Sequence, residues 1–291
     1  MSSKIKLMLA QKYGPCMGVS RAIKLACKTG KKFPGKTFLL GEIVHNQHVV
    51  TEIERKFSIH TVSDFAKIPK KTTVVIRAHG ISPRLRRKLL KRKLRIVDAT
   101  CPLVTKVHQV VKNYAKKGFR IIYLASEPTH DEAVGVKGEA QDKIKIVTLK
   151  DLSHLKIKNP ARTVLLTQTT LSIIETERAL KKLKAKFPLL KIEPHICPAT
   201  MERQKAVINL AKKADLIVVV GSPTSSNSKR LKETAQRAGG KKAMKVYLVD
   251  QAKELKPSWF KRIKLVGVTS GASTPNNVLQ AVIKKIKSFN R

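Results

Sequence analysis

Short apolar runs that end at small or polar residues recur along the whole chain. Residues 94–97 and residues 216–220 are two such runs, and the second is apolar at all five positions. An uninterrupted run of this length predicts a strand that is buried on both faces. Helical spacing follows the first run, with apolar residues at Val104, Val107 and Val111. Strand, turn and helix repeat in this way to the end of the chain, so the pattern predicts an α/β fold.

Three of the predicted strand-to-helix turns carry a cysteine. Cys101 follows Cys16 by 85 positions, and Cys197 follows Cys101 by 96. The first N–H groups of a helix have no partner inside the helix and can point at a bound anion. The helix dipole also favours a thiolate at this position. We therefore expect each turn to present a reactive sulfur beside free backbone N–H groups.

Polar side chains follow each cysteine at similar distances. The first set lies 28 to 30 positions after its cysteine and comprises His45, His130 and the segment from Ser225 through Ser226 to Asn227. The second set lies 63, 68 and 76 positions after and comprises His79, Thr169 and Ser273. A repeat of this kind predicts three similar α/β units, each offering one thiolate and two polar groups to a common centre.

The repeat also suggests domain boundaries. We expect a first unit at 14–100, a second at 101–196 and a third at 197–291, with a strand within 1–13 packing near the third. A chain of 291 residues is long enough for units of this size to have cores of their own.

The charge of the chain is unusual, because 61 Lys and Arg residues outnumber 19 Asp and Glu residues and give a net charge of +42. Such a surface attracts acidic proteins, anionic lipid or nucleic acid. Segment 84–95 holds eight basic residues, with Leu85, Leu89 and Leu90 expected on one helical side. It is a candidate docking face for an acidic partner, or a solvated face. Nucleic-acid binding stays open, although aromatic residues make up only 4% of the chain.

The cell compartment follows from what the sequence lacks. It shows no run of 18 apolar residues and no signal peptide, so we expect no membrane span. Four widely separated cysteines do not resemble a secreted disulfide framework, which favours a cytoplasmic location. Cys27 falls on the apolar face of a predicted helix and is expected to be structural.

Two polar segments are candidates for binding or proton transfer. Glu132 lies two residues after His130 and would serve as a proton donor if its pKa were tuned, whereas the alternative is a helix-start carboxylate near Thr129. The Ser-rich turn at 221–228 suits a phosphate group.

Three separated thiolates suggest a metal centre. A structural zinc site usually draws on closely spaced pairs, and no C-x₂-C pair occurs here. An iron–sulfur cluster tolerates any spacing that the fold brings together. With three cysteine ligands, a four-iron cluster would keep one iron open to a substrate oxygen, and the neutral donors around it would suit a diphosphate.

Nine motifs in order resemble the 4-hydroxy-3-methylbut-2-enyl diphosphate reductase (IspH/LytB) family, from about residue 14 to residue 283. They are residues 14–19 (GPCMGV), 41–46 (GEIVHN), 78–80 (AHG), 98–108 (DATCPLVTKVH), 130–132 (HDE), 168–172 (QTTLS), 196–200 (ICPAT) with Arg203 and Gln204, 225–228 (SSNS) and 271–273 (GAS).

This resemblance implies the last step of the non-mevalonate isoprenoid pathway, in which an allylic hydroxyl is removed to give isopentenyl and dimethylallyl diphosphates. It implies three α/β units in a pseudo-threefold trefoil around one [4Fe-4S] cluster, with Cys16, Cys101 and Cys197 as ligands and one open iron. Glu132 would be the proton source and Thr169 would help to position the substrate. The residues that would bind the diphosphate are His45, His79, His130, Ser225, Ser226, Asn227 and Ser273.

The resemblance also implies an acidic electron donor, ferredoxin or flavodoxin, for which a basic surface would speed docking. Two other hypotheses stay open on the sequence. One is a basic nucleic-acid-binding protein, and the other is a zinc-bound, catalytically silent relative.

Overall fold

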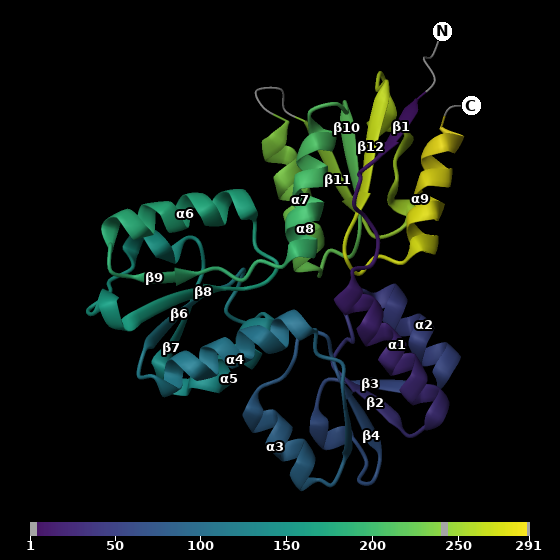
Figure 1. Cartoon of the computed structure of the whole chain (residues 1–291). Helices are drawn as coiled ribbons and strands as arrows, with labels where there is room; N and C mark the ends of the chain where they lie inside the picture. Colours follow the sequence, from purple (N-terminus) through teal and green to yellow (C-terminus); the bar gives the residue numbers. More distant parts are fainter. Residues whose placement is uncertain (1–4, 240–243, 290–291) are drawn as a thin grey trace. The chain divides into compact units, whose positions relative to one another are not determined.

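The computed structural model describes residues 5–239 and 244–289 (Figure 1). The described chain divides into two compact units. Unit 1 is drawn from 1–17, 45–49 and 198–291, and unit 2 comprises 18–44 and 50–197. Unit 1 contains one four-stranded parallel sheet and unit 2 contains two.

The first sheet of unit 2 has the strand order β3-β2-β4-β5, and all of its pairs are parallel. Its two central strands, β2 (Thr37–Leu40) and β4 (Thr73–Ile76), are buried at every position. The flanking strands are β3 (Ile59–Val62) and β5 (Arg95–Asp98). The helices that accompany this sheet are α1 (Met17–Lys32), α2 (Gln47–Phe57) and α3 (Pro83–Lys91).

The second sheet of unit 2 repeats this order as β7-β6-β8-β9. Its strands are β6 (Arg120–Leu124), β7 (Ile144–Val147), β8 (Thr163–Thr167) and β9 (Lys191–Glu193). Apolar residues of α4 (Pro102–Lys116) and α5 (Asp131–Ala140) pack on one face, whereas those of α6 (Ile173–Lys186) pack on the other. Cover on both faces explains why β6 and β8 are almost continuously apolar.

The sheet of unit 1 has the order β1-β12-β10-β11, which is the same arrangement again. Its strands are β1 (Lys6–Leu9), β10 (Leu216–Val220), β11 (Lys245–Val249) and β12 (Leu265–Ser270). Helix α9 (Asn276–Ser288) packs on one face, and α7 (Pro198–Ala211) and α8 (Ser226–Ala238) pack on the other.

The three sheets therefore share one topology, in which an edge strand leads directly toward a cysteine. Strand β5 precedes Cys101, β9 precedes Cys197, and β1 precedes Cys16. The strand predicted within 1–13 is β1, and it pairs in parallel with β12 from the far end of the chain. The predicted fold class, α/β with three similar units that fit a trefoil, is confirmed at the level of the units, while the boundaries at 14–100, 101–196 and 197–291 stay a proposal.

Two helices differ from the sequence prediction. The basic helix α3 stops at Lys91, because Lys93 has a backbone φ of +56° and the chain turns into β5 at Arg95. Leu90, expected on the buried side, is 56% exposed. Helix α8 (Ser226–Ala238) begins inside the segment 221–228, which the sequence predicts as a turn.

No helix in the described parts of the chain is long and apolar enough to cross a membrane.

The turns after β10 and β12 require residues without a side chain. A Cβ added at Gly221 or at Gly271 would collide with Oγ of Ser228, which is fully buried in the first turn of α8. The two glycines therefore let the turns close over the start of this helix.

We expect Gly271→Ala to lower the free energy of unfolding by about 1–3 kcal/mol, because the added methyl group overpacks the turn. Ser228→Ala removes the colliding oxygen, which has no hydrogen-bond partner among the described residues. The double variant should regain most of the lost stability in urea unfolding. Additive effects of the two substitutions would contradict this packing.

Candidate active site

Each of the three cysteines directly precedes a helix and is tied to its own sheet by one backbone hydrogen bond. The Cys16 N–H donates to the carbonyl of Ala272 at 3.1 Å. The Cys101 N–H donates to Ala78 at 2.9 Å, and the Cys197 N–H donates to Thr169 at 3.0 Å. The prediction that these turns present free N–H groups is therefore wrong for the cysteine amides, because the carbonyls that follow the neighbouring strands accept from them.

The carbonyl partners connect the cysteines with the second set of polar residues. Ala78 precedes His79, Ala272 precedes Ser273, and Thr169 is itself a member of the set. Each cysteine thus bonds to the polar segment that follows the neighbouring strand of the sheet. The three thiols occupy one repeated local frame and are all half-buried. Soft thiolates in such a frame are suitable ligands for an iron–sulfur cluster.

Cys27 stands apart from this frame. It lies within α1 and is half-buried. Burial is the largest cause of the raised pKa of its thiol, followed by the charge of Glu52. A thiol that resists ionisation is a poor metal ligand, which agrees with a structural role.

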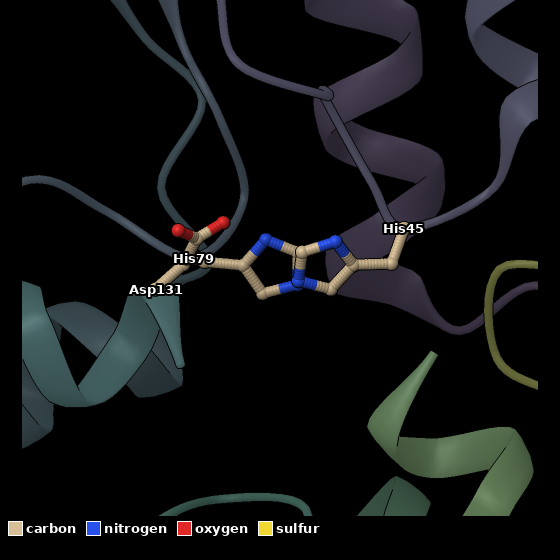
Figure 2. A group of neighbouring side chains, drawn as sticks. All are labelled: His45, His79 and Asp131. Atoms are coloured by element: carbon tan, nitrogen blue, oxygen red, sulfur yellow. The ribbon is translucent and has the colours of Figure 1, made fainter. Parts of the chain in front are cut away.

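His79 and His130 lie together in unit 2. Their rings meet edge to face with centroids 5.8 Å apart. Figure 2 shows Asp131 beside His79, and a nitrogen of that ring lies within 4.8 Å of a carboxylate oxygen of Asp131. The carboxylate also forms an ion pair with Arg77 at 2.8 Å. Burial lowers the pKa of the Arg77 guanidinium, and the charge of Asp131 opposes that shift.

Sequence reasoning missed the pair of Arg77 and Asp131. Arg77 follows β4 directly, two positions before His79, and Asp131 is the first residue of α5. The sequence contained one signal for this pair, which is an arginine at the end of an apolar strand. A guanidinium at such a position is partly buried and needs an anionic partner.

His130 is the N-cap of α5, in place of the Thr129 start considered from the sequence. Its Nδ1 accepts a hydrogen bond from the backbone N–H of Glu132 at 3.1 Å. A neutral ring whose Nδ1 accepts must carry its proton on Nε2. His130 therefore has an Nε2–H donor, and the side chain that holds it is only 8% exposed.

Glu132 is the most enclosed candidate residue, with 1% of its surface exposed. Its Oε1 accepts from the Thr169 backbone N–H at 3.0 Å and from the Tyr123 hydroxyl at 2.9 Å. Its Oε2 accepts from the Thr169 hydroxyl at 2.7 Å. Burial raises the pKa of this carboxyl, and the hydrogen bonds from Thr169 and Tyr123 offset part of that rise. A carboxyl with a raised pKa can hold a proton for donation near neutral pH.

Unit 1 holds the other predicted polar residues. Ser225 caps α8, and its Oγ accepts from the Ser228 N–H at 3.3 Å. The Ser273 hydroxyl donates to the backbone carbonyl of His45 at 3.2 Å. Asn227 is 6% exposed, and within the described residues its Nδ2 has no hydrogen-bond partner. A buried amide of this kind can donate to an anionic oxygen. Ser226 is the first residue of α8 and is half-buried.

Comparison with known proteins shows the family of the chain. The family model described as LytB protein matches residues 7–287. The chain belongs to the LytB family. A LytB relative from Acidothermus cellulolyticus, named 4-hydroxy-3-methylbut-2-enyl diphosphate reductase, is 41% identical over 283 residues, which cover 96% of this chain and 82% of the relative. A relative of the same name from Ralstonia nicotianae is 38% identical over 288 residues, covering 98% and 87%.

Solved structures show that this LytB chain shares a known fold. The E-1-hydroxy-2-methyl-but-2-enyl-4-diphosphate reductase from Plasmodium falciparum matches with a TM-score of 0.90 and 35% identity, covering 97% of this chain and 87% of that one. A structure of (E)-4-hydroxy-3-methyl-but-2-enyl diphosphate reductase, described as the terminal enzyme of the non-mevalonate pathway, matches with a TM-score of 0.66 and 31% identity over 98% and 99% of the two chains.

The raised pKa of Glu132 predicts how stability depends on pH. The folded state holds this proton more tightly than the unfolded state, so the free energy of unfolding falls as pH rises from the ordinary carboxyl range through the raised pKa. Glu132→Gln has no such proton. We expect the variant to gain stability relative to the wild type across that pH range, measured by urea unfolding at a series of pH values. Parallel curves would contradict the raised pKa.

Proposed function

We propose that this chain performs the reductive dehydroxylation of 4-hydroxy-3-methylbut-2-enyl diphosphate to isopentenyl and dimethylallyl diphosphates, the last step of the non-mevalonate pathway. Thr169 supplies the observation that carries the proposal. Its N–H and hydroxyl hold the buried carboxyl of Glu132, and its carbonyl accepts from the N–H of Cys197. A single residue thus connects a proton donor with a cluster ligand.

Members of this family use an iron–sulfur cluster, and the donor set fits one. We assign its ligands to Cys16, Cys101 and Cys197, which would hold one [4Fe-4S] cluster with one iron open. When bound, the cluster supplies electrons and a Lewis-acidic iron for the oxygen of the allylic hydroxyl.

The substrate diphosphate is held by imidazole, hydroxyl and amide groups. These are His45, His79, His130, Ser225, Ser226, Asn227 and Ser273. The Nε2–H of His130 and the buried Nδ2 of Asn227 are suited to phosphate oxygens, because they donate without carrying a full charge.

Glu132 donates the proton that lets the hydroxyl leave as water, and Thr169 positions that hydroxyl. The balance of the reaction is two electrons and two protons taken up, one C–O bond broken, and one C–H bond and one molecule of water formed. Because Glu132 is buried, its proton is retained until a substrate oxygen is close enough to accept it.

Glu132→Gln tests the proposal. We expect turnover to fall by about 10²-fold or more, because the amide cannot donate an acidic proton. Iron and sulfide content, measured on protein purified without oxygen, should stay unchanged. Cys101→Ser is the contrasting variant, and it should lose iron and sulfide. Normal turnover in Glu132→Gln would remove this residue from the mechanism. Wild-type protein that contains zinc, or no metal, would overturn the proposed reaction.

The reductant is an acidic electron carrier, ferredoxin or flavodoxin, and its docking face is the α3 surface. This surface comprises the exposed residues Arg84, Arg87, Lys88, Leu90 and Lys91. Beside it lies a hollow of about 320 Å³, lined by Arg86, Lys112, Thr105 and Thr100 among others. Thr100 directly precedes Cys101, so the hollow leads from the basic helix toward a cluster ligand.

Charge reversal checks this docking face. Arg87→Glu combined with Lys91→Glu should lower kcat/KM for the acidic carrier several-fold at low ionic strength, with a smaller effect as salt rises. Turnover with a small chemical reductant should not change. Lys181→Glu with Lys182→Glu, on exposed positions of α6, is the matched control. If both double variants lose kcat/KM for the carrier equally, the carrier docks on a different surface.

The other hypotheses receive less support. The family membership of the whole chain does not favour a nucleic-acid-binding protein, and the basic composition fits an acidic protein partner equally well. A zinc-bound, silent relative would have no need of an enclosed proton donor such as Glu132. A cytoplasmic location remains part of the proposal, because reduced thiolates are required.

A further inference from the structure

Tyr123 has no role in the reaction as described so far. It lies on β6 between α4 and α5 and is 0% exposed, and it heads the fully buried side chains by volume. Its ring packs among apolar residues that include Val107, Val136 and Val164. In the described part of the chain, its hydroxyl makes one hydrogen bond, which goes to Oε1 of Glu132 at 2.9 Å.

The two oxygens of Glu132 have different partners. Oε1 receives the backbone N–H of Thr169, which can never accept a proton, and the hydroxyl of Tyr123. Oε2 receives the hydroxyl of Thr169, which can turn and accept instead. A proton on Oε1 would have to go to the Tyr123 hydroxyl, whose own proton would then lose its one acceptor among the described residues. A proton on Oε2 instead faces the Thr169 hydroxyl, which is able to receive it. The acidic proton of Glu132 therefore resides on Oε2, toward Thr169.

Donation of that proton leaves a carboxylate in a site that excludes water. Burial without compensation would make this product costly, and hydrogen bonds to a charged acceptor are stronger than those to a neutral one. Tyr123 keeps its own proton, because burial and the nearby Glu132 hold the pKa of the phenol well above its usual value. The other groups that face the carboxyl are Thr169 after β8 and His108 on α4.

We propose that Tyr123 is a positioning residue for proton transfer, fixing Oε1 as an acceptor and stabilising the carboxylate that remains after Oε2 has given up its proton. The proposal rests on the proposed role of Glu132. It also gives a core residue a role in the reaction, because the stabilising hydroxyl belongs to the buried side of the sheet and not to the substrate side.

Tyr123→Phe is the first test. The carboxylate loses one of its three donors, so the pKa of Glu132 should rise by about one unit, and kcat should fall about tenfold with KM little changed. Because the protonated form is the active one, the basic limb of the kcat–pH profile should move to higher pH. Tyr114→Phe is the matched control, because the Tyr114 hydroxyl also donates to a glutamate, Glu193, at 2.7 Å.

An infrared titration of the full-length protein gives a readout that does not require turnover. The carboxyl band is assigned to Glu132 by its loss in Glu132→Gln. In Tyr123→Phe this band should persist to higher pH than in the wild type or in Tyr114→Phe. An unchanged titration overturns the proposal.

A monofluorinated tyrosine at position 123 keeps the hydroxyl and the packing, and it covers the case in which Tyr123→Phe does not fold. Its more acidic phenol is a stronger donor, so the infrared titration and the basic limb should both move to lower pH. No shift, or a shift to higher pH, overturns the proposal. If the infrared titration moves while the kcat–pH profile does not, Tyr123 acts on the carboxyl as inferred, and the proposed role of Glu132 fails instead.

Discussion

One backbone hydrogen bond, repeated three times, is the constraint on which the candidate site depends. In each repeat the N–H of a cysteine donates to a carbonyl just beyond the end of the neighbouring strand. This bond aligns the start of a helix with the carboxyl edge of a parallel sheet, where polar residues gather. The thiol and the polar residue next to the accepting carbonyl therefore form a fixed pair. Substitution of side chains at that edge can then change the chemistry of the site while the backbone hydrogen bond stays the same.

Thr169 shows how tightly this frame couples structure to chemistry. Its carbonyl takes part in the repeated bond, while its N–H and hydroxyl hold Glu132. The carboxyl is in turn enclosed by the core of the sheet through Tyr123. A substitution at Thr169 would disturb a cysteine turn and the buried carboxyl of Glu132 together. The corresponding positions beside the other two cysteines, His79 and Ser273, do not carry a buried acid in this way, so the pseudo-symmetric frame supports an asymmetric reaction.

Much of this arrangement could be predicted from the sequence, because strand and turn signals are local. Residues 216–220 form β10 as the apolar run predicts, and each cysteine lies at a strand-to-helix turn. Contacts that depend on how distant elements meet could not be predicted. The bond from Tyr123 to Glu132 requires the register of β6 against α5, and the exposure of Leu90 depends on where the chain leaves α3. The repeat suggests the three cysteines as ligands of one centre, and the resemblance implies which cluster they would hold.

The position of β1 has a consequence for how the protein is made. Among the described strands, β1 is synthesised first and its partner β12 last, and the N–H of Gly14 bonds to the side chain of Ser270 across 256 positions of sequence. The sheet of unit 1 cannot close until nearly the whole chain has been synthesised, and such distant pairing is slow to form. The turn that carries Cys16 is therefore completed last. With the ligand set proposed above, the three cysteines would be in place together only after synthesis, and iron and sulfide would be delivered at that stage.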